Sequence, residues 1–241
     1  MTDLLIPTGV LLLAGFVKGV IGLGLPAVGV GLLGLVMLPA QAAALLVVPS
    51  TVTNVWQLAA GPDFAALIRR LWPLLLGILV GAWLGHGRLA GDGSGQARVG
   101  LGLVLAVYAV LGLLDRRPRI PLRIEGWLGP VVGVVTGVVT AATGVFMVPA
   151  VPYLQGIGLE PEDLIQALGL SFTVSTLALA VDLFVGGAFD RTLLTGSALA
   201  LVPAMAGLFA GTWLRGRIAP PVFRRCFFVG LLLLGGQLAL R

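Results

Sequence analysis

Lys18 is a charged residue inside an apolar segment, where a helix that only anchors a protein in the membrane would not need one. It is the only lysine, and it lies in the apolar run GFVKGVIGLGLP, residues 15–26. An ammonium group inside a bilayer costs about 2.5–3.5 kcal/mol on insertion scales, so we expect it to face a cavity or a partner. Gly22, Gly24 and Pro26 predict an interrupted helix, whose exposed backbone amides would favour an anion. The alternative is that the Lys18 amine snorkels to a membrane interface.

A second group of polar residues follows Pro49, whose ring is expected to bend its helix. Ser50, Asn54 and Gln57 are spaced i, i+4 and i+7, which places them on one helical face, and Thr51 lies beside Ser50. A polar face in lipid must turn inward. We therefore expect this face either to line a central path or to hydrogen-bond to a packed helix, where each bond contributes about 0.6–2 kcal/mol.

The same residue types return later in the chain. Ser171, Ser175 and Asp182 share a helical face, and Thr143 and Gly144 precede them at the end of an apolar run. The same two interpretations apply here, namely a path lining and interhelical packing. Taken together, the two polar faces favour a path through the protein.

Asp182 is the only carboxylate in a predicted span. It is the candidate for proton coupling, and the alternative is that it marks a helix end before Gly186. His86 follows the last apolar residues of another segment, so we expect it at a membrane interface and not in a proton relay.

Enzyme and cofactor chemistry are not supported by the sequence. The single histidine, His86, and the single cysteine, Cys226, are far apart, so we expect no metal cluster and no catalytic pair or triad. Gly29, Gly31 and Gly34 match the dinucleotide-binding pattern, but no strand precedes them. We expect neither an enzyme nor a bound cofactor.

The composition is that of an integral membrane protein. Of the 241 residues, 58% are hydrophobic and only 10% are charged, and the mean hydropathy is +1.08. Soluble domains have about 25% charged residues, so a soluble fold of this size would lack polar surface. The net charge of +5 comes from arginines in short loops, as the positive-inside rule expects, and not from a nucleic-acid surface.

Apolar runs broken by charged or turn residues predict the membrane segments. In the first half they are 4–24, 26–38, 41–60, 71–87 and 99–114, and in the second half 127–148, 149–157, 164–186, 193–214 and 222–240. The polar connection 115–125 separates the halves. A full span needs about 20 apolar residues, so 26–38 is too short to span comfortably.

The order of segment lengths repeats, and so do individual residues. Gln41, Leu45 and Ser50 recur 125 positions later as Gln166, Leu170 and Ser175, and Gln57 then corresponds to Asp182. With an offset of 130, residues 71–84 match residues 201–214 at six positions. Spaced glycines predict close helix packing at Gly15/Gly19, Gly77/Gly81, Gly133/Gly137 and Gly207/Gly211.

Loop charge predicts how the two copies face. Equivalent loops differ in basic character, which places them on opposite sides of the membrane and makes the repeat inverted. The basic loops 61–70, 115–125 and 215–225 are then cytoplasmic, and the amino terminus lies outside.

These glycine patterns resemble those of the sulfite exporter TauE/SafE family of membrane permeases. The resemblance depends on residues 15–26 in the first copy and on 133–137, Gly144, Pro149 and 169–172 in the second. It covers nearly the whole chain. It implies a multi-pass carrier of the bacterial plasma (inner) membrane for small sulfur-containing anions such as sulfite, sulfoacetate or other organosulfonates, coupled to protons.

We therefore expect an all-α polytopic bundle of about 8–10 membrane segments, with a first repeat at 1–120 and a second at 121–241. We expect an exporter working by alternating access, with an anion channel or a permease for an unrelated organic anion as alternatives. Its partners are a small anion and the lipid bilayer, and a homodimer is left open. The substrate-binding residues expected are Lys18, Gly22, Gly24, Ser50, Thr51, Asn54, Gln57, Thr143, Gly144, Ser171 and Ser175, with Asp182 for proton coupling.

Overall fold

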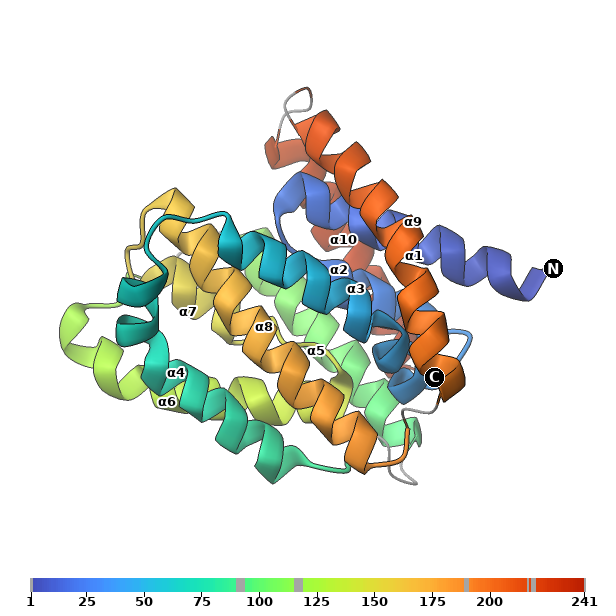
Figure 1. Cartoon of the computed structure of the whole chain (residues 1–241), viewed down its shortest axis with the longest axis horizontal. Coiled ribbons are helices and arrows are strands. Elements are labelled where there is room, and N and C mark those ends of the chain that lie inside the picture. The colour runs from blue at the N-terminus through green and yellow to red at the C-terminus, as the bar shows by residue number, and fades with distance from the viewer. Residues whose placement is uncertain are drawn as a thin grey trace.

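The structure is a computed structural model that describes residues 2–89, 94–114, 119–188, 191–215, 217 and 220–240. Within these residues the chain is helical and contains no strand (Figure 1). The helices are α1 (Thr2–Ile21), α2 (Leu25–Leu33), α3 (Pro39–Ala59), α4 (Phe64–Gly85), α5 (Ser94–Leu114), α6 (Leu122–Thr143), α7 (Ala150–Gly156), α8 (Pro161–Val185), α9 (Arg191–Arg215) and α10 (Pro220–Ala239).

Seven of the described helices are long and apolar enough to cross a membrane, namely α3, α4, α5, α6, α8, α9 and α10. Helix α1 carries a shorter apolar stretch, Leu5–Ile21. Helices α2 and α7, with 9 and 7 residues, are too short to span. The chain is a polytopic helical membrane protein, and each half begins with the predicted broken hairpin followed by three long helices.

Both hairpins are broken at glycines with a positive φ. Helix α1 ends before Gly22 (φ 81°) and Gly24 (φ 107°), and α6 ends before Gly144 (φ 74°). A left-handed backbone strains residues that carry a Cβ, so glycine stops these helices where a longer apolar run would continue. Proline follows each break: Pro26 opens α2, and Pro149 immediately precedes α7.

The predicted glycine pairs form the closest helix contacts, and they join one half of the chain to the other. A Cβ added to Gly15 of α1 would lie 2.0 Å from the Ala204 carbonyl oxygen of α9, and one added to Gly81 of α4 would lie 2.0 Å from that of Val134 in α6. Only glycine permits such an approach. The halves therefore interleave, with α1 against α9 and α4 against α6.

These contacts also give the helix directions. Along α1 and α9, Gly15 faces Ala204 and Gly19 faces Leu208, so the two helices run in parallel. Helices α4 and α6 are likewise parallel, whereas α3 and α8 pair in opposite directions. The counterparts α3 and α8 therefore run in opposite directions, and so do α5 and α10, where Gly102 faces Ala239 and Gly112 faces Phe228, in agreement with the predicted inversion.

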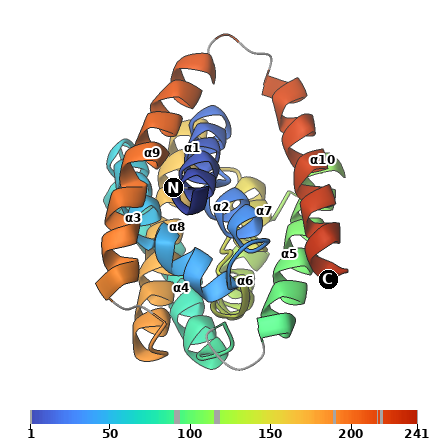
Figure 2. The ribbon, with the colours of Figure 1, turned by 90° about the vertical axis from the view of Figure 1, so that its right-hand side faces the viewer.

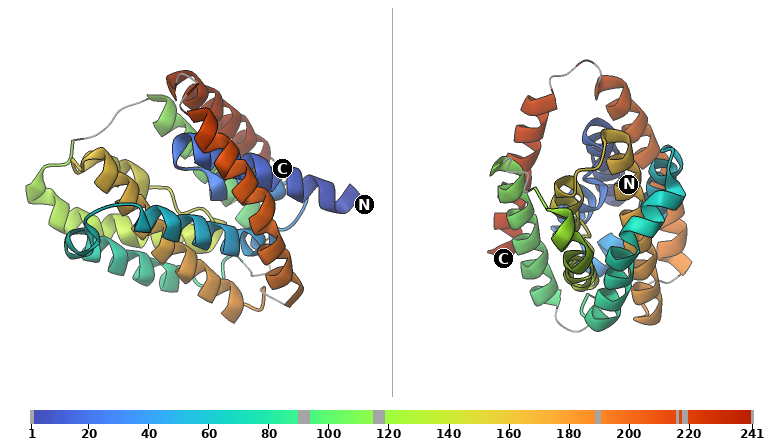
Figure 3. Two further views of the ribbon diagram at one scale, coloured as in Figure 1. Left: turned by 45° about the horizontal axis from the view of Figure 1, so that its top comes forward. Right: turned by 90° about the vertical axis from the view of Figure 1, so that its left-hand side faces the viewer.

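The antiparallel pair of α3 and α8 crosses the middle of the molecule (Figure 1). Figure 2 shows α9 and α10 on opposite sides, with α1, α2 and α7 between them. The right-hand view of Figure 3 shows the same arrangement from the opposite side, with the short helices between α9 and α10. The breaks of the two hairpins therefore lie within the bundle, whereas the outer turns of α1 and α6 are exposed.

Candidate functional site

Lys18 lies inside the protein, one turn before the end of α1. It is only 5% exposed. Its ammonium group donates to Thr53 Oγ1 at 2.9 Å and also to Asn54 Oδ1, both on α3. Snorkelling to an interface, the alternative interpretation from the sequence, does not occur in this structure. Both of these partners are uncharged.

The Lys18 group continues across the bundle to the second half. Asn54 is 1% exposed, and its amide nitrogen donates to Thr176 Oγ1 on α8 at 3.1 Å. Asn54 thus uses its carbonyl oxygen for the lysine and its amide nitrogen for the threonine. Three helices, α1, α3 and α8, are connected through this one side chain.

Gln57 is the next polar residue of the same α3 face. It is buried, and its Nε2 lies 3.5 Å from the Gly22 carbonyl oxygen at the break of the first hairpin. This contact places the α3 polar face directly beside the interrupted backbone. Gly24 is also buried, and it packs near Val17 and Phe227.

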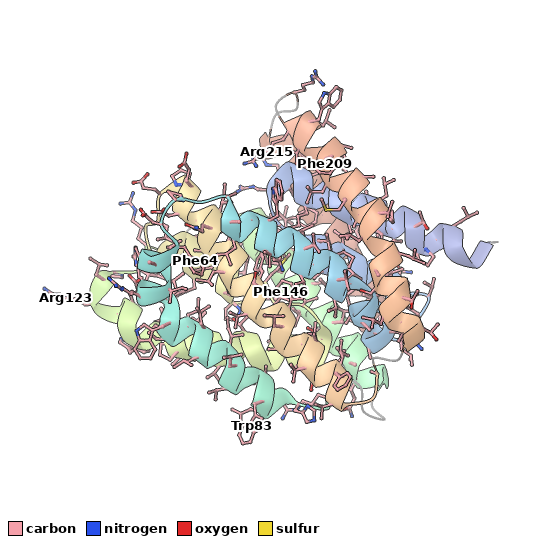
Figure 4. The ribbon with its side chains drawn as sticks, in the orientation of Figure 1. Phe64, Trp83, Arg123, Phe146, Phe209 and Arg215 are labelled. Atoms are coloured by element: carbon pink, nitrogen blue, oxygen red, sulfur yellow. The ribbon has the colours of Figure 1, made fainter. Side chains whose placement is uncertain are left out.

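A narrow cavity lies between the two broken hairpins. Its lining includes Pro26 after the first break, Gly144 and Phe146 in the second, and Ser50 and Thr176 from α3 and α8. The cavity volume is about 10 Å³, which is room for about one water molecule. Phe146 marks the position in Figure 4, near the middle of the bundle, whereas Arg123, Arg215 and Trp83 project at its edges.

Ser171 and Ser175 lie one turn apart on α8. Both are fully buried, and the hydroxyl oxygen of each has no hydrogen-bond partner in the described part of the chain. Burial of a hydroxyl without a partner costs about 1–3 kcal/mol. Such orphaned groups are candidates for contact with a ligand or an ordered water.

Thr51 and Thr143 use their hydroxyls locally. Thr51 Oγ1 donates to the Val47 carbonyl at 2.8 Å, and Thr143 Oγ1 donates to the Val139 carbonyl at 2.8 Å. The Thr143 oxygen also accepts the Val145 N–H at 3.2 Å. Thr143 therefore shapes the second break, and Thr51 is only half-buried on α3.

Asp182 lies apart from these groups, toward the other end of α8. Its Oδ1 contacts His86 Nδ1 and accepts the Gly87 N–H at 3.1 Å. Its Oδ2 is buried and has no partner within the described residues. Asp182 lies in the last turn of α8, which ends at Val185, and its backbone carbonyl accepts the Gly186 N–H at 2.9 Å, so the alternative that Asp182 marks the helix end also fits. The contact with His86 was not expected from the sequence.

An ion pair at the opposite end of α4 joins Arg70 to Glu125 of α6. Arg70 Nε and Nη2 donate to the two carboxylate oxygens at 2.7 and 2.9 Å, and Nη2 also donates to the Ile157 carbonyl at 2.8 Å. A pocket of about 260 Å³ opens beside this pair. Because the ion pair is neutral overall, it offers no unbalanced charge to a ligand.

The structure thus gathers some of the predicted residues in three places and leaves Ser171, Ser175 and Asp182 outside them. Lys18 and Asn54 form one group, Gln57 and Gly22 adjoin it, and Ser50 and Gly144 share the cavity. Sequence reasoning missed Thr53 and His86 as partners. A buried ammonium needs hydrogen-bond acceptors, so Thr53, next to Asn54, could have been predicted as a partner of Lys18. No spacing in the sequence relates His86 to Asp182.

A protein-family model described as sulfite exporter TauE/SafE matches residues 8–238, which is nearly the whole chain. No curated protein and no solved structure matches this chain.

Proposed function

The chain belongs to the sulfite exporter TauE/SafE family, and we propose that it exports small sulfur-containing anions by alternating access, coupled to protons. Membership supports a membrane permease or exporter of sulfur anions in general, and a transporter in place of an enzyme. Sulfite, sulfoacetate and other organosulfonates are the substrates proposed. The membrane proposed is the bacterial inner membrane.

The observation that carries the proposal is a buried ammonium without a carboxylate. Lys18 is 5% exposed and its hydrogen-bond partners, Thr53 and Asn54, are both neutral. A cation in a low-dielectric interior is costly unless a negative charge approaches it. A small anion bound beside Lys18 would supply that charge.

The remaining polar groups suit an oxyanion because most of them can donate. The hydroxyls of Ser171 and Ser175 have no partner among the residues that the structure describes, and Ser50 lines the cavity between the hairpins. The proposed site also includes Gly22, Gly24, Thr51, Gln57, Thr143 and Gly144. Sulfite and sulfonate oxygens accept hydrogen bonds, so a set rich in ammonium, hydroxyl and amide donors matches them.

The size of the cavity favours a carrier over a channel. A cavity of about 10 Å³ is too small for a sulfite ion and its water. We propose that this is a closed state, and that one pair of parallel helices moves against the other to admit the anion. An anion channel remains the alternative function, and it would give currents well above carrier turnover.

The test is flux of radiolabelled sulfite in proteoliposomes. Lys18→Met is expected to lose anion flux because the only buried lysine charge is removed. Arg69→Gln is the matched control, because Arg69 is an exposed cation on α4 outside the proposed site. Protein-free vesicles measure the leak.

Undiminished sulfite flux in a folded Lys18→Met protein would contradict the assignment of Lys18. Absence of sulfite flux in the wild type would direct the same assay to sulfoacetate and then to unrelated organic anions. Single-channel currents in a planar bilayer would favour the channel instead.

A further inference from the structure

We propose that His86 and Asp182 form the proton pathway of this protein, in which His86 exchanges protons with water and Asp182 holds the coupling proton. The inference rests on the proposed transport function and adds to it a residue that the sequence did not indicate. It starts from the contact between His86 Nδ1 and Asp182 Oδ1.

The two side chains differ sharply in exposure. The His86 side chain is 45% exposed and lies just beyond the end of α4, whereas the Asp182 side chain is 4% exposed within α8. One member of the pair therefore faces outward and the other inward. A proton carried between them would move from the protein surface into the bundle.

The chemistry of the two groups suits a relay. An imidazole ring has two nitrogens, so it can take up a proton at Nε2 while releasing another from Nδ1. The Gly87 N–H, 3.1 Å from Asp182 Oδ1, stabilises the ionised carboxylate that would receive it. The proton arrives on Oδ1, and the buried Oδ2 has no partner among the described residues, so a rotation of the carboxyl group that exchanges the two oxygens would turn this proton inward.

The proton step balances without any other reactant. A proton from water adds to Nε2 of His86, and the Nδ1 proton passes to the carboxylate of Asp182. The ring stays neutral overall, and Asp182 becomes a neutral acid. This neutral acid no longer attracts the ring and the Gly87 N–H as an ion does, so the link between the end of α4 and α8 weakens.

Among the described helices, few other charged residues surround the pair. Helices α3, α4, α6 and α7 pack against α8. Helices α3 and α7 carry no formally charged residue, and the charged residues of α4 and α6 lie in the first two turns of these helices, at the far end. Glu162 and Asp163 of α8 are also at its far end, Arg88 is exposed beside His86, and Arg98 begins α5. In the described part of these helices, Asp182 is the acid at this end.

Helix α8 connects the relay to the Lys18 group. Thr176, which accepts the Asn54 amide, precedes Asp182 by six residues, a rise of about 9 Å along the helix. Both the proton site and a partner of the proposed anion site therefore lie on one rigid element. Protonation of Asp182 and binding of the anion would therefore both affect the position of α8.

The experiment separates anion exchange from proton movement. Proteoliposomes loaded with unlabelled sulfite receive labelled sulfite without a pH gradient, and a pH-sensitive dye inside the vesicles reports protons during net sulfite flux. Asp182→Asn is expected to abolish sulfite-dependent proton movement while labelled sulfite still exchanges. His86→Gln, which changes a more exposed side chain, is expected to slow proton movement by about 100-fold, the low end for a positioned proton carrier. Arg88→Gln is the matched control and should leave both readings unchanged.

The outcomes are distinct. If the wild type exchanges sulfite and the variants lose proton movement, the inference stands. Normal proton movement per sulfite in both Asp182→Asn and His86→Gln would overturn it and leave the transport function intact. A wild type that exchanges sulfite without moving protons would also overturn it, and a wild type that exchanges no sulfite would overturn the transport proposal itself.

Discussion

The two copies of the repeat share their packing and differ in their charge. Gln57 of α3 and Asp182 of α8 occupy equivalent positions, 125 residues apart. Gln57 is a neutral amide that contacts the Gly22 carbonyl, whereas Asp182 is a carboxylate that contacts His86. The first copy supplies a buried cation with neutral partners, and the second supplies a buried acid linked to an exposed ring.

This difference shows that the helix packing and the polar residues of the two halves can differ independently. The glycine contacts between α1 and α9 resemble those between α4 and α6, because in each pair two glycines of either helix face backbone carbonyl oxygens of the other. The paired glycines that let helices approach thus recur in both halves, whereas the polar residues differ. The comparison predicts symmetric effects from packing changes and asymmetric effects from changes of charge.

The largest expected effect comes from the shared glycine contacts. Gly15→Ala in α1 and Gly133→Ala in α6 should each destabilise the protein by about 3 kcal/mol or more, because the added methyl would overlap a backbone carbonyl and a helix must shift. Thermal unfolding in detergent would measure both. Gly9→Ala is the matched control, since its Cβ would meet no described atom within 4 Å. A large loss from only one of the two glycine changes would break the symmetry.

The next effect concerns the cation of the first copy. Asn54→Asp would place a carboxylate against the Lys18 ammonium and cancel its charge. We expect the affinity for sulfite to fall by about 10–100-fold, which corresponds to losing a charged hydrogen bond. The KM of sulfite flux in proteoliposomes checks this. Unchanged affinity in Asn54→Asp would mean that the positive charge of Lys18 is not used to bind the anion.

The orphaned hydroxyls of α8 should behave differently from ordinary packing residues. Ser175→Ala removes an unpartnered buried oxygen, so the folded protein is expected to be as stable as before or slightly more so. The same change should weaken sulfite binding by about 1 kcal/mol, or roughly five-fold, if the hydroxyl donates to the anion. Thermal unfolding and KM, measured together, separate the two roles. Lower stability with unchanged KM would assign Ser175 to packing alone.

The smallest expected effect is at the Arg70–Glu125 pair, which the other copy lacks. The residue 130 positions after Arg70 is Ala200. Arg70→Gln should lower stability by about 1 kcal/mol, because the arginine is one-third exposed and water screens the pair. Sulfite flux should not change. Arg69→Gln, the exposed neighbour, should stay within about 0.5 kcal/mol of the wild type.

Much of the fold could be predicted from the sequence because its rules are local. Glycines with a positive φ stopped α1 and α6 where Gly22, Gly24 and Gly144 predicted a break. The lengths of the membrane segments follow from the thickness of the bilayer, and regularly spaced glycines predict close contacts between helices. Residue spacing does not predict which helices pack against each other. Nothing in residues 9–19 of α1 indicates that α9 is their neighbour.

The candidate site was predicted less completely for the same reason. Buried polar residues were found by type, and Lys18, Asn54, Ser171, Ser175 and Asp182 are all inside the bundle. The partners Thr53 and His86 were missed. A hydrogen bond between residues 96 positions apart depends on how helices pack, and helical periodicity reports only which residues share a face.

The sequence by itself determined that the chain is a membrane protein and that its two halves are inverted copies. It also determined at which residues the helices break. Hydropathy, glycine and loop charge act along a single helix or loop, so they can be read without coordinates. The tertiary structure alone decided that the halves interleave, that Lys18 meets Asn54 and that His86 meets Asp182. Those pairings depend on the relative positions of helices far apart in the chain, which packing of the whole bundle sets.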